Sequence, residues 1–258
     1  MATISKFIIC ALFAFAIAIT NSDIATSQSV PKRIKNIVLV HGAFADGSSW
    51  QKVIRLLETE GFHVVAVQNP LTSLEDDVAA TRRAIASVDG PVLLVGHSWA
   101  GIVITEAGND PKVARLLYVC AFTPSDGQSL TDVAKTFPPA SGNSEVRLSS
   151  SGFLSLSFKG INEDFAQDVP SADRTVMFAT QGPWAAKCTT EKISHAAWKT
   201  KPSWFIVGVN DHMINPDLER AEAKMIQATT LELKSSHVPM ISQPDNVAAF
   251  IMQAAGKL

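Results

Sequence analysis

The amino-acid sequence predicts an α/β fold, in which a mostly parallel sheet of about six strands carries helices on both faces. From residue 36 onward, short apolar runs alternate with amphipathic segments, which is the pattern of strand–helix–strand units. The first run, residues 37–40, is continuous and rich in β-branched residues, as expected of a strand buried on both faces. Hydrophobic residues make up 47% of the chain and charged residues 18%, so it can bury a sizeable core.

The remaining expected strands are short apolar runs bounded by turn residues. Residues 63–67 follow a glycine, and residues 91–95 precede a Gly-containing turn. The later runs lie at residues 113–121, 203–208 and 229–234.

The expected helices are recognised from apolar side chains that recur on one face. The first stripe follows the i, i+3, i+4, i+7 pattern and ends at Gly61. Thr72 followed by Glu75 resembles a capping box and starts a second helix. Two more helices are expected at residues 217–228 and 245–254. The two stripes consist of Trp50, Val53, Ile54 and Leu57, and of Leu74, Val78 and Ile85.

The alternation stops between about residues 123 and 201, although a length of 258 residues suits one large domain. This stretch contains Pro138-Pro139 and a run of three serines, and it has no clear buried strand. Weak helical patterns lie at residues 163–168 and 171–180. The sequence therefore predicts an inserted helical cap over about residues 123–201, which is too long for an ordinary connection and is expected to be functional.

The first 27 residues have the pattern of a secretory signal peptide. Lys6 precedes an uninterrupted apolar run at residues 7–19, which is shorter than a membrane-spanning helix requires. Ala25 and Ser27 supply the small residues of a cleavage site, so cleavage is expected after Ser27. The mature domain would then comprise residues 28–258, without a membrane span, in a secreted or periplasmic protein. The alternative is an uncleaved N-terminal anchor.

The charge balance and the cysteine count exclude several classes of protein. The chain has 22 basic and 24 acidic residues, which argues against a nucleic-acid partner. Three cysteines are too few for a disulfide scaffold. After signal removal Cys120 and Cys188 remain, and the sequence leaves open whether they pair or are separate buried thiols.

The motif Gly96-His97-Ser98-Trp99-Ala100-Gly101 lies where a buried strand becomes a helix. A nucleophile elbow needs small residues two positions before and after the serine, because the tight turn leaves no room for larger side chains. Gly96 and Ala100 meet this requirement, although the second position is usually glycine. Ser98 is therefore the candidate nucleophile, rather than part of an ordinary strand–helix turn.

A serine nucleophile needs a base and a carboxylate that orients the base. Of the six histidines, only His237 lies in a loop between the last strand and the last helix. Asp211 follows the expected strand at residues 203–208 and gives the chain order Ser–Asp–His. Asp126, after the fourth strand, is the rival acid. Joint placement at the carboxyl ends of strands favours Ser98, His237 and Asp211.

The loop His41-Gly42-Ala43-Phe44 follows the first strand and faces the elbow. The backbone amides of Ala43 and Trp99 are the candidate oxyanion hole, and Gly42 allows close approach of the backbone. The loop lacks the Gly-Lys-Ser/Thr of a phosphate loop, and no G-x-G-x-x-G motif is present. We therefore expect neither a metal nor an organic cofactor.

Together with residues 41–50, these motifs resemble the α/β-hydrolase fold over essentially residue 36 to the C-terminus. They are most similar to its small branch of plant methyl-ester esterases, hydroxynitrile lyases and bacterial esterase-like proteins. The resemblance implies a Ser98–His237–Asp211 triad and the two oxyanion donors. Hydroxynitrile lyases of this branch commonly carry Thr at the position of Gly42 and Lys at that of Val238. Both departures favour ester hydrolysis over cyanohydrin cleavage.

The leading hypothesis is thus a serine hydrolase that acts on a carboxylic ester of a small to medium, largely apolar molecule. The alternatives on the same fold are a lactonase, a cofactor-free haloperoxidase or perhydrolase, and a hydroxynitrile-lyase-like enzyme. A non-catalytic ligand-binding relative is disfavoured, because a pure binder has no need of all three triad residues. The candidate pocket residues are the aromatic side chains Phe44, Phe122, Phe178 and Trp184.

Overall fold

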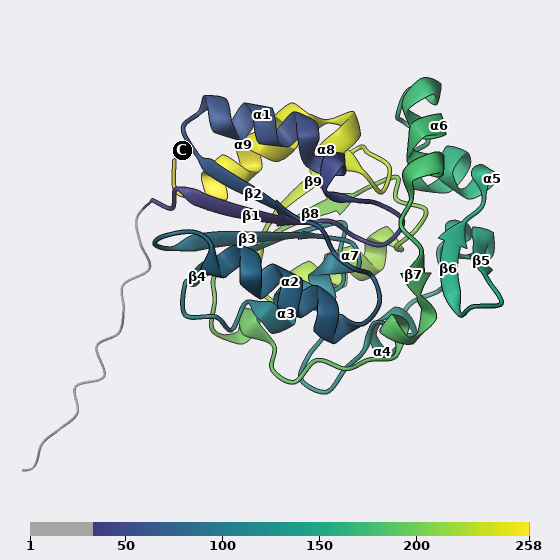
Figure 1. Cartoon of the computed structure of the whole chain (residues 1–258), viewed down its shortest axis with the longest axis horizontal. Coiled ribbons are helices and arrows are strands. Elements are labelled where there is room, and N and C mark those ends of the chain that lie inside the picture. The colour runs from purple at the N-terminus through teal and green to yellow at the C-terminus, as the bar shows by residue number, and fades with distance from the viewer. Residues whose placement is uncertain (1–32, 258) are drawn as a thin grey trace, which may run out of the picture. The chain divides into compact units, whose positions relative to one another are not determined.

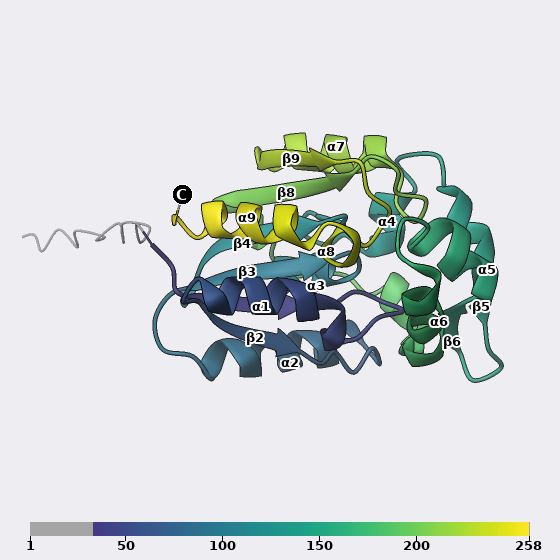
Figure 2. The ribbon, with the colours of Figure 1, turned by 90° about the horizontal axis from the view of Figure 1, so that it is seen from above.

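Six strands form the central sheet in the order β2-β1-β3-β4-β8-β9 (Figures 1 and 2). All neighbouring strands in this sheet are parallel, as predicted. The structure, a computed structural model, describes residues 33–257, so the predicted signal peptide at residues 1–27 lies outside the described residues. The strands are β1 (Asn36–Val40), β2 (His63–Val67), β3 (Val92–His97), β4 (Val113–Val119), β8 (Ser203–Gly208) and β9 (Thr229–Leu233).

Helices cover both faces of this sheet (Figure 1). On one face lie α1 (Gln51–Thr59), α8 (Pro239–Ser242) and α9 (Pro244–Ala254), and on the other lie α2 (Leu74–Ala86) and α3 (Ala100–Ala107). A further helix, α7 (Pro216–Met225), packs against β8. Every residue of β1 and of β3 is buried. The continuous apolar runs of these strands are explained by this burial on both faces.

The start of α2 differs by one residue from the prediction. Ser73, not Thr72, is the N-cap, and its side chain accepts a hydrogen bond from the Asp76 amide at 3.0 Å. Thr72 instead donates its hydroxyl to the Asp76 carboxylate at 2.6 Å. Two adjacent hydroxyl residues are followed, after Leu74, by three adjacent acids, so the capping pattern alone fits either register. The structure adopts the register that buries Leu74.

The insertion between β4 and β8 is not purely helical as predicted, because it contains a second, antiparallel sheet of three strands in the order β5-β6-β7. These strands are two to four residues long, too short for a periodicity to be seen. The helix α6 (Ser171–Thr180) coincides with a predicted helical pattern. The other cap elements are α4 (Leu130–Ala134), η2 (Ser141–Glu145), β5 (Val146–Leu148), β6 (Phe153–Leu156), α5 (Phe158–Gly160), η3 (Ile161–Phe165), β7 (Trp184–Ala185), η4 (Ala186–Thr189) and η5 (Ala197–Lys199).

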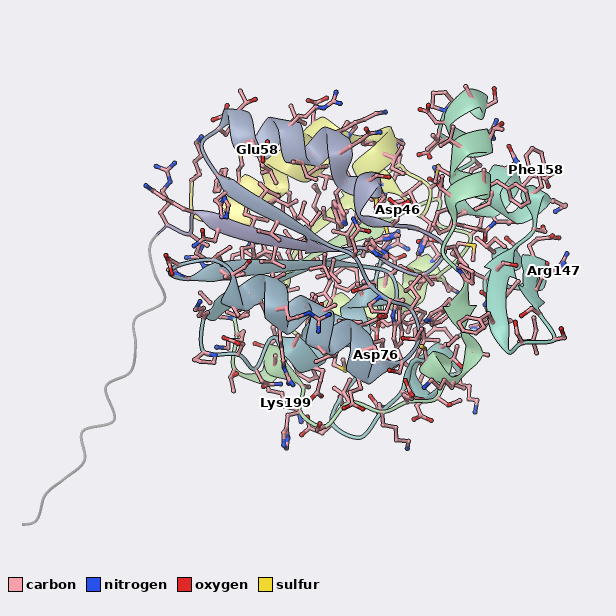
Figure 3. The ribbon with its side chains drawn as sticks, in the orientation of Figure 1. Asp46, Glu58, Asp76, Arg147, Phe158 and Lys199 are labelled. Carbon is pink, nitrogen blue, oxygen red and sulfur yellow. The ribbon has the colours of Figure 1, made fainter. Side chains whose placement is uncertain are left out.

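The cap lies beyond the carboxyl ends of the sheet strands (Figures 1 and 2). Exposed charged side chains such as Glu58 of α1 and Asp76 of α2 lie on the helices that cover the sheet (Figure 3). Because the cap lies beyond the strand ends, it covers the site formed by the loops there. Within residues 33–257, no helix has the length and hydropathy needed to cross a membrane.

Candidate active site

Ser98 occupies a sharp turn between β3 and α3. Its φ angle is 55°, a left-handed conformation that a residue with a side chain rarely adopts. The Ser98 amide donates to the Val119 carbonyl at 3.1 Å, and the Ser98 carbonyl accepts from the Gly101 amide at 2.9 Å. A Cβ atom on Gly96 would lie 2.7 Å from the Ala100 carbonyl oxygen. The turn thus requires a small residue at position 96, which is the reason for the elbow pattern.

Gly42 lies directly against the elbow. A Cβ atom at this position would be 2.8 Å from the Ser98 Cβ atom and 2.9 Å from the His97 carbonyl oxygen. Both distances are shorter than the separation that non-bonded atoms prefer, so a side chain at position 42 would clash with the elbow. Glycine at position 42 therefore lets the loop after β1 approach the turn that carries Ser98.

His237 and Asp211 form a buried pair beside this turn. The His237 Nδ1 and Asp211 Oδ2 atoms are 2.5 Å apart, and both residues are at most 2% exposed. The other oxygen, Asp211 Oδ1, accepts the amides of Met213 at 2.6 Å and of Ile214 at 2.9 Å. Because an ionised carboxylate only accepts, His237 Nδ1 carries the proton and donates it. Nε2 of a neutral His237 is then free to act as a base.

Two further histidines hold the backbone around the site. The amide of Asn69 donates to His41 Nε2 at 2.9 Å, so His41 Nδ1 carries the proton and donates to the Gly42 carbonyl at 2.8 Å. His97 Nε2 lies 2.9 Å from the His237 carbonyl oxygen and must donate to it. Burial lowers the pKa of His41, and burial together with nearby His237 lowers the pKa of His97 well below its usual value. Both rings are thus neutral supports.

A second layer of buried groups lies behind Asp211. Side-chain atoms of Cys120, Asp211 and Glu219 lie within 4.8 Å of one another. Burial, followed by the charge of Asp211, raises the pKa of Glu219 well above its ordinary value, and burial does the same to the thiol pKa of Cys120. Burial therefore favours the neutral, protonated form of both side chains. Cys120 and Cys188 are both buried free thiols, which answers the question of pairing that the sequence left open.

The candidate oxyanion donors are the amides of Ala43 and Trp99. Within residues 33–257, neither amide donates a hydrogen bond to a loop or cap carbonyl or to a side chain. The Trp99 indole donates to Asp77 Oδ2 at 2.8 Å, which anchors this residue at the start of α3. Burial raises the pKa of Asp77 to about 6, and the hydrogen bonds from Trp99 and from the Leu71 amide oppose this shift. Two unpaired amides beside a serine are the arrangement that stabilises an oxyanion.

A pocket of about 90 Å³, here called the inner cavity, brings most of these residues together. Of the sequence-predicted residues, Asp211 lies behind His237 rather than in the cavity wall, and Phe178 is absent from the wall. The predicted residues that line the cavity are Ala43, Phe44, Ser98, Trp99, Phe122, Trp184 and His237.

The sequence did not identify six other residues that line the inner cavity. Met213 and Ile214 follow Asp211 closely, so their position after the acid was an available signal. Phe165 lies in one of the weak helical patterns, and its ring centroid is 5.2 Å from that of His237. The other three, Leu130, Asn143 and Val146, come from the cap, where the sequence offered no signal.

The prediction that Phe178 lines the pocket is wrong. Phe178 is 38% exposed, and its ring packs edge-on against Phe158 with centroids 5.3 Å apart. Phe158 projects from the outer side of the cap (Figure 3). Phe178 lies on the side of α6 that faces α5, whereas other residues of α6 face the sheet domain. An aromatic side chain alone did not indicate which face of the helix it occupies.

Asp126, the rival acid, is engaged elsewhere. Its carboxylate is 45% exposed, pairs with Lys199 at 2.8 Å and accepts the Ala196 amide at 2.7 Å. The hydrogen bond from Lys199, and then that from Ala196, lowers the pKa of Asp126. Asp211 is therefore the acid that the fold brings to His237.

Comparisons with known proteins agree with this architecture. A family model described as "Alpha/beta hydrolase family" matches residues 37–250. The alpha/beta hydrolase nvfD of Aspergillus novofumigatus is 27% identical over 250 residues, covering 86% of this chain and 96% of the relative. The putative methylesterase 12, chloroplastic, of Arabidopsis thaliana is 23% identical and covers 91% of this chain and 77% of the relative. The crystal structure of polyneuridine aldehyde esterase superposes with a TM-score of 0.73 at 20% identity, covering 85% of this chain and 98% of that chain.

Proposed function

Because the chain belongs to the alpha/beta hydrolase family, we propose that it is a serine esterase whose nucleophile, base and acid are Ser98, His237 and Asp211. The observation that carries this proposal is the buried 2.5 Å contact of Asp211 with His237, which lines the inner cavity together with Ser98. The contact orients the imidazole and leaves its second nitrogen available as a base.

The proposed reaction proceeds through an acyl-enzyme. Ser98 Oγ attacks the ester carbonyl carbon while His237 Nε2 accepts the hydroxyl proton, and the amides of Ala43 and Trp99 stabilise the negative oxygen. His237 then donates that proton to the alcohol oxygen as the bond between carbonyl carbon and alkoxy oxygen breaks. Water attacks the acyl group in the same way and releases the acid. Asp211 stays ionised and orients His237 throughout.

The character of the inner cavity supports a substrate whose reacting end is small and largely apolar. Most of its lining is aromatic or aliphatic, including Phe44, Phe122 and Trp184, and a space of about 90 Å³ holds only a compact group. The names of the relatives, among them methylesterases and an aldehyde esterase, are compatible with this substrate class.

Covalent labelling with a fluorophosphonate tests the proposal. We expect the wild-type protein to be labelled at Ser98 and to hydrolyse p-nitrophenyl acetate, while the folded Ser98→Ala variant does neither. Asp126→Asn serves as the matched control and should be labelled at the wild-type rate. A folded wild-type protein that is not labelled at Ser98 would refute the proposed function.

We also propose that the enzyme is exported, on the basis of the apolar run at residues 7–19 and the small residues Ala25 and Ser27. Expression of the full chain in its host, followed by N-terminal sequencing of the protein in the periplasmic or extracellular fraction, tests this proposal. We expect the mature chain to begin at Gln28. A protein that keeps Met1 in the cytoplasmic fraction would contradict it.

A further inference from the structure

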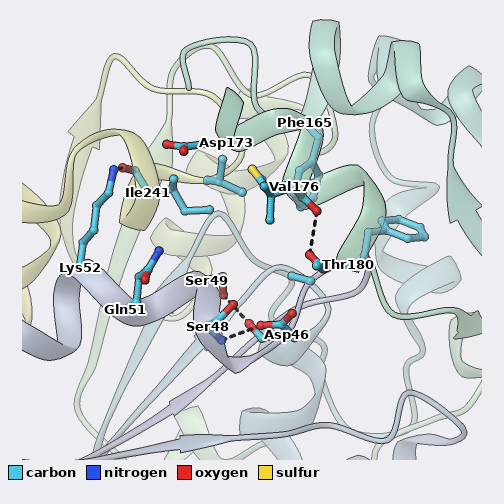
Figure 4. A pocket seen from close by; sticks show the side chains of 14 residues that line it. Asp46, Ser48, Ser49, Gln51, Lys52, Phe165, Asp173, Val176, Thr180 and Ile241 are labelled. Atoms are coloured by element: carbon cyan, nitrogen blue, oxygen red, sulfur yellow. Dashed lines mark hydrogen bonds between the residues drawn. The ribbon is translucent and has the colours of Figure 1, made fainter. Parts of the chain in front are cut away.

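A second and larger cavity lies beside the inner cavity. It measures about 320 Å³ and is called the outer cavity here. One wall is α6 of the cap, and the opposite wall is formed by η1 (Gly47–Trp50), the first turn of α1 and α8 (Figure 4). Phe44 and Phe165 line both cavities, so only these two rings are shared between the spaces.

The helix α6 presents one face to the outer cavity. Its lining residues Asp173, Val176, Met177 and Thr180 fall at i, i+3, i+4 and i+7, so they form a single stripe. No residue of α6 is buried, and Val176 is 59% exposed. The two middle residues of this stripe, Val176 and Met177, are apolar and line the cavity, where a ligand can contact them.

Most polar groups of the opposite wall are already satisfied within the protein. The Ser48 amide donates to Asp46 Oδ1 at 2.7 Å, and Lys52 Nζ donates to the Ile241 carbonyl at 3.1 Å. The apolar side chains of Val238 and Ile241 complete this wall. An occupant therefore meets more apolar than polar surface, although the side chains of Gln51 and Asp173 also line the cavity.

The boundary between the two cavities lies on the His237 side of the inner cavity. Phe165 packs against the His237 ring, and Val238, the next residue in the chain, lines the outer cavity. Phe44 is held in a left-handed conformation with a φ angle of 59°, and its ring packs edge-on against Trp184 at 5.8 Å. In the proposed reaction His237 delivers a proton to the leaving alcohol, so the alcohol departs on this side.

We propose that the outer cavity is the subsite for the alcohol part of the ester, which passes between Phe44 and Phe165 and lies along the Val176 stripe of α6. This inference rests on the proposed function and narrows its substrate class. The acyl group is small, as the inner cavity requires, and the alcohol is larger and largely apolar. Specificity for the alcohol is then set by the cap rather than by the triad.

Two isomeric esters place the same carbon chain on opposite sides of the reacting bond and so test this assignment. Hexyl acetate carries the chain in the alcohol, methyl heptanoate carries it in the acyl group, and ethyl acetate is the short reference. In Val176→Trp the indole occupies the outer cavity. Thr175→Trp adds the same group to α6 at a position outside the lining and is the matched control. The rates are measured by pH-stat titration.

We expect Val176→Trp to lower kcat/KM for hexyl acetate tenfold or more, because one methylene in an apolar pocket can change kcat/KM by about 10-fold or more. Ethyl acetate should change less than twofold, as should ethyl acetate and hexyl acetate with Thr175→Trp. Because the inner cavity holds only a compact acyl group, wild type should hydrolyse methyl heptanoate more slowly than hexyl acetate. The inference is overturned if hexyl acetate is unaffected by Val176→Trp, if wild type does not hydrolyse it, or if wild type hydrolyses methyl heptanoate faster than hexyl acetate. Labelling of Ser98 and ethyl acetate hydrolysis separate these results from failure of the proposed function, which would abolish both.

Discussion

Replacement of Gly42 by alanine tests whether the loop after β1 positions the nucleophile. The added Cβ atom would lie 2.8 Å from the Ser98 Cβ atom and 3.0 Å from His97 Nδ1. Non-bonded carbon atoms prefer separations of about 3.5–4.0 Å, so the loop and the elbow must move apart by about 1 Å. Neither neighbour can yield easily, because His97 is fully buried and Ser98 is part of the constrained turn.

A displacement of this size has a calculable consequence for catalysis. Misplacement of a reacting group by about 1 Å can cost about 100-fold in rate. The same movement would withdraw the adjacent Ala43 amide from the oxyanion, in the same direction. We therefore expect Gly42→Ala to lower kcat/KM for p-nitrophenyl acetate about 100-fold, which corresponds to about 2.7 kcal/mol of transition-state stabilisation.

The matched control for this variant is Gly182→Ala. There the added Cβ atom would lie 2.9 Å from Leu71 Cδ1, the end of a flexible side chain that can rotate away. This control should retain kcat/KM within threefold. Melting followed by circular dichroism, together with the rate of fluorophosphonate labelling, shows that the loss in Gly42→Ala is not unfolding. A folded Gly42→Ala enzyme with wild-type kcat/KM would refute the reasoning.

Three other substitutions probe the acid, a buried carboxyl group and the elbow. Asp211→Asn should lower kcat for p-nitrophenyl acetate by about 10³–10⁴-fold, because the asparagine favours the wrong His237 tautomer; Asp126→Asn, assayed in parallel, should not. Burial raises the pKa of Glu222 from 4.5 to about 8. Between these two pH values the native state binds more protons than the unfolded state, so the native state loses stability as the pH rises through this range. In urea unfolding from pH 4 to 9, Glu222 should contribute up to about 5 kcal/mol of this loss, and Glu222→Gln should remove that part while the loss due to Asp77 and Glu219 remains; an unchanged slope would contradict the assignment. Ser98→Gly should be more stable than Ser98→Ala by about 1 kcal/mol in urea unfolding, and equal stabilities would show that the turn is not strained.

The positions of the proposed triad residues could be predicted because parallel strands bring their carboxyl ends to one edge. Ser98 follows β3, Asp211 follows β8 and His237 follows β9, and these strands belong to the contiguous part β3-β4-β8-β9 of the sheet. A residue placed directly after a buried strand therefore has a known position even before the side chains are built. Chain order and strand ends were enough to favour Asp211 over Asp126.

The cap was less predictable because its structure depends on contacts between residues far apart in the chain. The strand β7 has two residues and pairs with β6 across α5 and α6, so no local periodicity reveals it. Phe178 was assigned by residue type, whereas its position relative to the stripe that contains Val176 decides which way it faces. The fold of the cap also brings Phe165 against His237, and the spacing of residues along the chain does not indicate this contact.

Backbone strain at the edge of the sheet is a second property that the residue pattern did not show. Phe44, Ser98 and Cys120 have φ angles of 59°, 55° and 43°, and each lies just beyond the end of β1, β3 or β4. None is glycine, so turn residues do not reveal Phe44 or Cys120, and only the elbow pattern indicated a tight turn at Ser98. Each such conformation costs about 1–3 kcal/mol and persists only where the surrounding structure enforces it. At position 98 glycine would remove the strain, but only a residue with a side chain can carry a nucleophile. The extra stability expected of Ser98→Gly thus measures what the fold gives up to hold the hydroxyl above the sheet.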